Sequence, residues 1–294
     1  MRRTRSIVVG VDGTDSGHDA LDWAAAEAAA RRLPLRIVHA YTTAPSWAGL
    51  ADVPPPYGDT ADTAAAANQV LEQAVHRARY VASEIKLTTR LVMGPGASAM
   101  LAQCDEADLL VLGSRGLGGV RGLLAGSVSF RVATHATCPV VVVRPMQPTP
   151  PGRSATRVVV GVDGTPLSDR AIAFATRAAA QRGVGLTAIH TWSPRGPIYP
   201  DAVTDSWSLA EAAEWRTLQG VLRQCGRRLA TADIKLRLVL GRAQDVLVTE
   251  SAGAALVVVG SRGRGSVRAA LLGSVSQAVL QHAACPVAVV RSVS

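Results

Sequence analysis

Aromatic residues are scarce in this chain of 294 residues, at 4% of the sequence, whereas apolar residues as a whole make up 48%. The core must therefore be built from alanine, valine and leucine, which is typical of helices packed on buried parallel strands. Long apolar runs are also lacking, and none reaches the roughly 20 residues that span a bilayer. The basic start MRRTRSIVVGVDGTD has an apolar run that Asp12 interrupts early. We interpret it as a first strand rather than a signal peptide, and we expect no membrane partner.

Cysteines are few: Cys104, Cys138, Cys225 and Cys285 contain no CxxC pair. Four dispersed cysteines are too sparse for a disulfide framework and lack the spacing of a metal site. We therefore predict a reducing, cytoplasmic location and no bound structural metal.

Lysine is nearly absent, because Lys86 and Lys235 are the only two, although the net charge is +9. The basic excess is thus arginine, which is compatible with nucleic-acid binding. However, the arginines are dispersed along the chain, and few aromatic residues are present to stack on bases. A solvated arginine-rich surface is the simpler interpretation, and a nucleic-acid binder remains the less favoured alternative.

The sequence contains one unit twice. SIVVGVDGTDSGHDALDWAAAEAAARRLPLRIVHAY matches RVVVGVDGTPLSDRAIAFATRAAAQRGVGLTAIHTW at an offset of 151 residues, and CPVVVVR matches CPVAVVR at an offset of 147. A repeat of this length is a duplicated domain rather than a solenoid. The proline-rich string PMQPTPPGRSAT separates the copies. We predict an N-terminal domain over residues 1–146, a linker over 147–156 and a C-terminal domain over 157–294.

Strand and helix patterns alternate within each copy. In the first copy, helices are predicted from about Ser16 to Arg32, from about Asp62 to Glu84, around Ala97 to Cys104 and from near Ser127, with Ser16 or Asp15 as the first N-cap. In the second copy, strands are predicted near Val158, Leu186, Lys235, Leu256 and Val287. Such alternation predicts an α/β fold in which right-handed crossovers build a parallel sheet covered on both faces.

A glycine-rich loop follows the fourth strand of each copy. GSRGLGGVRGLLAGSVS begins at Gly113, and GSRGRGSVRAALLGSVS begins at Gly260. Glycines let backbone N–H groups approach a ligand, and the helix that each Gly-Ser opens has unpaired N–H groups suited to an anion. The loops could also simply turn the chain, but their common spacing in two copies favours binding. They contain no GxxxxGK[ST] string, and GxGxxG does not follow the first strand.

The whole chain resembles the universal stress protein family in its tandem form. The most specific element is the ATP-binding pattern G-x2-G-x9-G-[ST], which Gly113, Gly116, Gly126 and Ser127 satisfy, as do Gly260, Gly263, Gly273 and Ser274. The resemblance implies strand order 3-2-1-4-5 in each domain and two ATP sites per chain. In each site it places the acidic residue after the first strand near the nucleoside, the end of the second strand near adenine, and the glycine loop along ribose and phosphates.

Carried onto this sequence, the resemblance implies the following ATP-binding residues in the two halves: Asp12, Gly13, His39, Ala40, Gly113, Ser114, Arg115, Gly116, Gly118, Gly119, Gly126, Ser127, Val128 and Ser129, and Asp163, Gly164, His190, Thr191, Gly260, Ser261, Arg262, Gly263, Gly265, Ser266, Gly273, Ser274, Val275 and Ser276. Asp12 and Asp163 carry oxygen ligands suited to magnesium, so magnesium is compatible with bound ATP. The resemblance also implies that the last strands pair between domains or subunits, giving a homodimer.

No residue of the loops is an identifiable general base for phosphoryl transfer. We therefore predict a nucleotide-dependent regulator of stress response or growth with no dedicated enzyme activity, and slow ATP hydrolysis is the alternative. Arg115, Arg121, Arg262 and Arg268 lie in register within the loops, where they pair with phosphates, pair with acidic groups across a dimer, or stay solvated. Structural roles are predicted for His39 with His190, His135 with His282 and Cys138 with Cys285.

Overall fold

The computed structural model describes residues 5–42, 60–114, 126–144, 157–193, 211–216, 218–220, 233–263 and 272–291. The chain divides into two compact units, Met1–Val143 and Arg144–Ser294. The proline-rich linker predicted at 147–156 lies outside the described residues. Among the described helices, none is both long enough and apolar enough to span a bilayer.

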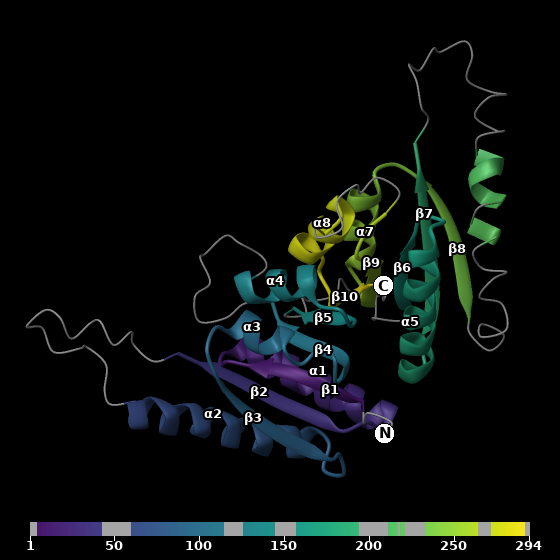
Figure 1. Cartoon of the computed structure of the whole chain (residues 1–294). Coiled ribbons are helices and arrows are strands. Elements are labelled where there is room, and N and C mark those ends of the chain that lie inside the picture. The colour runs from purple at the N-terminus through teal and green to yellow at the C-terminus, as the bar shows by residue number, and fades with distance from the viewer. Residues whose placement is uncertain are drawn as a thin grey trace, which may run out of the picture. The chain divides into compact units, whose positions relative to one another are not determined.

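The N-terminal unit contains a five-stranded parallel sheet (Figure 1). Its strands are β1 (Ser6–Val11), β2 (Leu35–Tyr41), β3 (Leu87–Met93), β4 (Ala107–Gly113) and β5 (Val140–Val143). The pairings give the order β3-β2-β1-β4-β5. The predicted α/β class and the strand order 3-2-1-4-5 are therefore confirmed in this unit.

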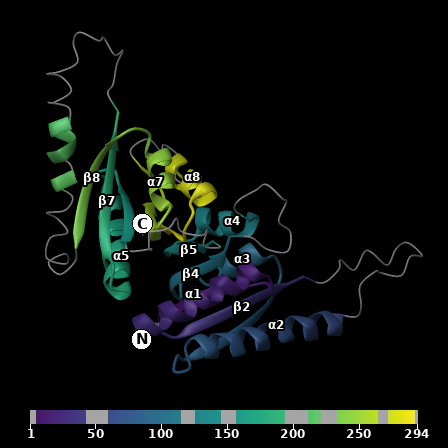
Figure 2. The ribbon, with the colours of Figure 1, turned by 180° about the vertical axis from the view of Figure 1, so that it is seen from behind.

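Four helices connect these strands: α1 (Asp15–Arg31), α2 (Thr60–Val81), α3 (Gly96–Leu101) and α4 (Ser127–His135). Helix α1 packs against α2, and α3 packs against α4, as right-handed crossovers in this strand order require. Helix α2 lies alongside β2 and β3, as the two opposite views show (Figures 1 and 2). The two helix pairs bury the central strands, in which Ile7, Val8 and Val9 have no exposed surface.

The C-terminal unit repeats this arrangement. Its strands are β6 (Arg157–Val162), β7 (Gly185–Trp192), β8 (Ile234–Leu240), β9 (Ala254–Gly260) and β10 (Val287–Val290). They pair in parallel in the order β8-β7-β6-β9-β10, which matches the order in the first unit. The helices with defined bounds are α5 (Pro166–Arg182), α7 (Ala243–Ser251) and α8 (Ser274–His282), and residues 211–216 and 218–220 are also helical.

The N-cap of α1 is Thr14, not Ser16 or Asp15 as the sequence suggested. The Thr14 hydroxyl accepts a hydrogen bond from the Gly17 N–H at 3.2 Å, which satisfies one of the unpaired donors of the first turn. Thr165 is the N-cap of α5, but its side chain makes no capping hydrogen bond and Pro166 follows it. The two copies therefore begin their first helix at matched positions with different polar contacts.

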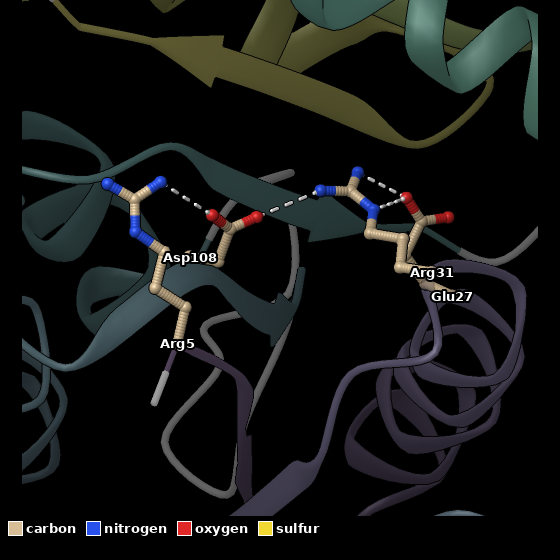
Figure 3. Close-up of polar contacts among 4 residues, drawn as sticks. All are labelled: Arg5, Glu27, Arg31 and Asp108. Atoms are coloured by element: carbon tan, nitrogen blue, oxygen red, sulfur yellow. Dashed lines mark hydrogen bonds and ion pairs between the residues drawn. The ribbon is translucent and has the colours of Figure 1, made fainter. Parts of the chain in front are cut away.

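An ion-pair network lies where β1 and β4 begin, at the edge opposite to the glycine loops (Figure 3). Asp108 contacts Arg5 at 3.4 Å and Arg31 at 3.3 Å. Arg31 also donates from Nε to Glu27 at 2.6 Å, and Glu27 is buried within α1. Because a buried carboxylate is costly without a cation, this network fixes the end of α1 against the start of β4.

Candidate functional site

The strand order reverses between β1 and β4 in the first unit and between β6 and β9 in the second. In doubly wound sheets, the carboxyl ends of the strands at such a reversal form a crevice that binds ligands. The turns after β1 and β6 and the glycine loops after β4 and β9 start at this point. These turns are the elements that the sequence marked as candidate sites.

Asp12 follows β1 and is held by the start of α1. Its Oδ1 accepts hydrogen bonds from the Thr14 hydroxyl at 2.6 Å and from the Thr14 N–H at 3.1 Å. Gly13 has a φ of 77°, a left-handed conformation that favours glycine. The turn therefore fixes the orientation of the carboxylate and uses only one of its two oxygens.

Asp163 occupies the matching position after β6 and is held more tightly. Its Oδ1 accepts from the Thr165 N–H at 3.0 Å, the Thr165 hydroxyl at 2.7 Å and the Ser168 hydroxyl at 2.6 Å. Ser168 also accepts from the Asp163 N–H at 3.0 Å. The first copy has Gly17 where the second has Ser168, so this additional clamp is specific to the C-terminal half.

The loop after β9 lies against the turn after β6. A Cβ at Gly263 would be 2.9 Å from Asp163 Oδ2, a contact too close for a side chain without movement of the carboxylate. Gly263 is the second glycine of the G-x2-G-x9-G-S pattern in this copy. The structure therefore brings together two elements that the sequence separates by about 100 residues, namely the acidic turn and the glycine loop.

Gly113 has a packing role in the structure, besides the ligand contact that the sequence predicts for it. A Cβ there would overlap the backbone carbonyl of Ser16 and would lie 2.6 Å from the Ser16 hydroxyl. The absence of a side chain thus allows the first turn of α1 to pack directly on the end of β4. The first glycine of this loop is required for packing, whether or not its backbone also contacts a ligand.

Each glycine loop is closed by matched hydrogen bonds. The Gly126 N–H donates to the Ser114 carbonyl at 2.6 Å, and the Gly273 N–H donates to the Ser261 carbonyl at 2.9 Å. The Ser129 hydroxyl donates to the Gly113 carbonyl at 2.5 Å, while Ser276 does the same to Gly260 at 2.5 Å. The hydroxyl protons of these two serines therefore hold the helix to the strand.

Helices α4 and α8 begin at these closed loops without a side-chain cap. Their N-caps, Gly126 and Gly273, make no capping hydrogen bond, and the first helical residues, Ser127 and Ser274, are exposed. The N–H groups of an uncapped first turn and the positive end of the helix dipole together favour an anion. Both halves thus present the same feature at the switch point of the sheet.

Ser261 provides a further polar group beside this loop. It has no exposed surface, and its hydroxyl oxygen has no hydrogen-bond partner in the part of the chain that the structure describes. A buried hydroxyl without a partner costs free energy, so such groups are rare in folded proteins. Its position directly after Gly260 places this hydroxyl at the base of the C-terminal loop.

His39 and His190 lie near the carboxyl ends of β2 and β7 and are both buried. His39 Nδ1 lies 2.7 Å from the Val11 carbonyl, and His190 Nδ1 lies 2.6 Å from the Val162 carbonyl. Since a carbonyl only accepts, Nδ1 carries a proton in each case. These bonds link the end of the second strand to the end of the first.

In the part of the chain that the structure describes, His190 also has a partner at its other ring nitrogen. Its Nε2 lies 2.8 Å from Glu214 Oε2. At the offset of 147 residues, Glu214 corresponds to Ala67 and the buried Leu218 to the buried Leu71. The sequence pattern did not identify Glu214, although an acidic residue where the other copy has a buried alanine was the available signal.

Several predicted site residues lie outside the described residues. These are Arg115, Gly116, Gly118 and Gly119 in the first loop and Gly265 and Ser266 in the second, together with the arginines at 121 and 268. Within the described part of the chain, no cluster of three or more histidine, cysteine, aspartate or glutamate residues is suited to a metal ion. The remaining predicted residues lie at the carboxyl ends of the strands or in the first turn of α4 or α8.

The two halves define the class of this protein by its fold, a duplicated doubly wound α/β unit in which a glycine-rich sequence follows the fourth strand of each sheet. The sequence model of the universal stress protein family matches residues 3–144 and 155–291. The chain belongs to the universal stress protein family and carries two domains of it in tandem.

Relatives match along almost the full length. Universal stress protein Rv2005c of Mycobacterium tuberculosis is 36% identical over 296 residues, which cover 99% of this chain and 98% of the relative. Universal stress protein Rv1996 of the same organism is 36% identical over 312 residues, covering 97% and 94%. The crystal structure of a universal stress protein from Archaeoglobus fulgidus, 19% identical, covers 99% of both chains with a TM-score of 0.69, which supports the fold.

Proposed function

We propose that each half of this chain binds one ATP and that the protein acts as a nucleotide-dependent regulator rather than as an enzyme. The observation that carries this proposal is the pair of matched glycine loops, each closed onto an uncapped helix N-terminus. An exposed serine and unpaired N–H groups at this place suit the phosphates of a nucleotide better than a neutral ligand.

In each half, different residues bind the phosphates and the ribose. In the N-terminal half, the backbone at Gly126 and Ser127 binds the phosphates, while Asp12 accepts hydrogen bonds from the ribose. In the C-terminal half, Gly273 and Ser274 have the first role and Asp163 the second. The histidines hold the ends of β2 and β7 in place through the carbonyls of Val11 and Val162, which positions the neighbouring backbone for adenine.

Magnesium fits this scheme only as a companion of the phosphates. Each half supplies one carboxylate at the switch point, Asp12 or Asp163, and a hard cation needs several more oxygen ligands. Bound phosphate oxygens and water would supply them. The protein residues would then orient the nucleotide, and magnesium would neutralise part of its charge.

Regulation follows from the loops rather than from bond cleavage. Binding of phosphate to the first turns of α4 and α8 would bring the nucleotide against the glycine loops and so change a surface that a protein partner recognises. The same proposal includes a cytoplasmic location and assembly as a homodimer of tandem chains. A slow ATP hydrolase is distinguished by phosphate release well above one equivalent per site.

The test is to identify the nucleotide that the protein carries. Folded protein is purified without added nucleotide, dialysed against a set of adenine nucleotides and then denatured, and the released molecules are quantified by mass spectrometry. The proposal predicts ATP in preference to AMP and to a nucleoside without phosphate. Equal retention of adenosine and ATP would contradict it, because the helix N-termini contribute only when phosphate is present.

A further inference from the structure

Two cysteines of the N-terminal unit lie beside the start of β4. The Cys104 carbonyl accepts from the N–H of Ala107, the first residue of β4, at 3.3 Å. Cys138 precedes Pro139, whose carbonyl accepts from the N–H of Leu110 in β4 at 3.0 Å. Both cysteines are free and buried, with exposed fractions of 8% for Cys104 and 7% for Cys138.

The C-terminal unit has the same pair of positions, but one of the two cysteines is replaced by serine. At the offset of 147 residues, Ser251 takes the place of Cys104, and Cys285 takes the place of Cys138. The Ser251 hydroxyl accepts from the N–H of Ala284, the residue before Cys285, at 2.8 Å. In the N-terminal unit, the Thr137 N–H, at the position of Ala284, lies close enough to the Cys104 sulfur to lower its pKa. The side chain at position 104 therefore lies next to the cysteine at position 138.

The surroundings shift the pKa values of the two thiols in opposite directions. A hydrogen bond from the Cys138 thiol lowers the pKa of Cys104, and the Thr137 N–H lowers it further, against the opposing effect of burial. The same bond to Cys104 raises the pKa of Cys138, as do its burial and the charge of Asp108. Asp108 is itself held by Arg5 and Arg31 (Figure 3). Cys104 is thus suited to be the thiolate nucleophile, and Cys138 the neighbouring thiol.

We propose that Cys104 and Cys138 form a dithiol that reacts with hydroperoxides and closes to an intrachain disulfide. The Cys104 thiolate attacks one oxygen of the peroxide, so that an S–O bond forms and the O–O bond breaks. The departing hydroxide takes up a proton and leaves as water. The Cys138 sulfur then attacks the Cys104 sulfur, forming the S–S bond and breaking the S–O bond, and its proton leaves with the hydroxyl as a second water.

The atoms and electrons of this sequence balance with hydrogen peroxide as the oxidant. Two thiols lose two electrons and two protons in total, and the two peroxide oxygens gain them as two molecules of water. The dithiol lies at the amino ends of β4 and β5, whereas the glycine loops start at carboxyl ends. The proposed thiol reaction therefore takes place away from the proposed nucleotide site, and each proposal can be tested without the other.

The test uses the full-length, folded protein. The protein is treated with hydrogen peroxide, remaining thiols are blocked with N-ethylmaleimide, and the chain is digested with trypsin without reduction. Cys104 falls in the tryptic peptide 91–115, and Cys138 falls in 132–153, since Arg144 precedes a proline. The expected product is one linked pair of these two peptides, which separates on reduction.

Three single variants sharpen the result. Cys104→Ser introduces the residue that the other half carries at Ser251, so the fold is expected to persist and the linkage to disappear. In Cys138→Ser, the sulfenic acid on Cys104 has no thiol to resolve it and should proceed to sulfinic acid, which adds the mass of two oxygens to peptide 91–115. Cys285→Ser is the matched control and should leave the linkage unchanged.

Two results would overturn the proposal. One is a folded protein in which Cys104 and Cys138 resist peroxide and become linked or oxidised only in urea, as inert buried cysteines would. The other is linkage of Cys104 to Cys225 or Cys285 in yields similar to that with Cys138, which would show random oxidation.

Discussion

The two halves of this chain share a fold and a glycine loop but differ in the polar contacts around them. Among the described residues, Asp12 accepts hydrogen bonds from Thr14, whereas Asp163 accepts them from both Thr165 and Ser168. The loop closures, by contrast, are nearly identical, with matched bonds at both ends. The hydrogen bonds that close the glycine loops are therefore the same in both copies. The contacts of the acidic turns differ, and so do the residues before the fourth strand, where Cys104 corresponds to Ser251.

The largest contrast between the halves is expected in thiol reactivity. The pKa of Cys104 is lowered by its cysteine partner, while burial raises the pKa of Cys285 to about 12. Because the thiolate is the reactive form, Cys104 should react with peroxide at least about 100-fold faster than Cys285 at pH 7. Time-resolved peptide mass spectrometry measures both rates in one sample.

The rate of the reaction with peroxide should depend on pH differently at the two cysteines. A lowered pKa keeps Cys104 as a thiolate below the pH of about 8.5 at which an ordinary thiol titrates. The rate at Cys104 should therefore persist as the pH falls below that value, whereas the rate at Cys285 should increase up to high pH. Parallel pH profiles at the two cysteines would contradict this contrast.

A negative charge at the start of α4 or α8 should remove nucleotide from one half at a time. Ser127→Asp and Ser274→Asp each place a carboxylate where the phosphates would bind, and we expect affinity at that half to fall about 100-fold. The exposed acid interacts favourably with the helix dipole, so the melting temperature should not fall. Calorimetric titration measures the affinity, and Ser127→Ala and Ser274→Ala are the uncharged controls. A loss of both sites from one substitution would show that the halves do not bind independently.

Gly113→Ala should destabilise the N-terminal unit by about 1–3 kcal/mol, the usual cost of an overpacked core. Its Cβ would overlap the Ser16 backbone, which cannot move without shifting α1. Gly96→Ala is a matched control, because a Cβ there would make only ordinary contacts with Val128 at 3.7 and 3.8 Å. Urea denaturation separates the two variants, and equal stabilities would disprove the packing role of Gly113.

Glu214→Ala makes the C-terminal half resemble the N-terminal half, in which Ala67 takes this place. It removes the partner of His190 Nε2, so we expect a loss of about 1.5 kcal/mol of stability, in the range of hydrogen bonds to charged groups. The measurement is chemical denaturation. Ala67→Gly, at the matched position of the N-terminal half, is the control for shortening a side chain where no histidine bond is lost. Unchanged stability in Glu214→Ala would mean that water replaces the carboxylate at no cost.

The smallest expected effect concerns the first helix of each half. Thr14→Ala removes a capping hydrogen bond and the bond to Asp12, so it should cost about 1 kcal/mol. Thr165→Ala removes only the bond to Asp163, because Thr165 does not cap α5. Its cost should therefore be lower, and the reverse order of the two values would refute the assignment of the caps.

Much of the fold could be predicted from sequence because the repeat and the alternation of apolar runs are local and periodic. The start of α4 at Ser127 agrees with the pattern, and the bounds of α1 differ from it by one residue at each end. The position of the site at the strand ends follows from the same alternation, since parallel strands must all end at one edge of the sheet.

The contacts that distinguish one residue from another could not be predicted in this way, because they join distant segments. Nothing in the glycine spacing indicates that Gly113 makes room for Ser16, or that the Ser129 hydroxyl bonds to the Gly113 carbonyl. Cys104 and Cys138 show no CxxC spacing, yet the crossover from β4 to β5 brings them together. Thr14 was missed as an N-cap because aspartate and serine, the residue types at positions 15 and 16, are more favoured at that position than threonine.

Binding stoichiometry is the most direct test of the two proposed ATP sites per chain, one at each glycine loop. Calorimetric titration of the folded chain should give two equivalents of ATP, one equivalent for either Ser127→Asp or Ser274→Asp, and none for the double variant. Two equivalents retained in the double variant, or none bound by the unaltered chain, would contradict the account.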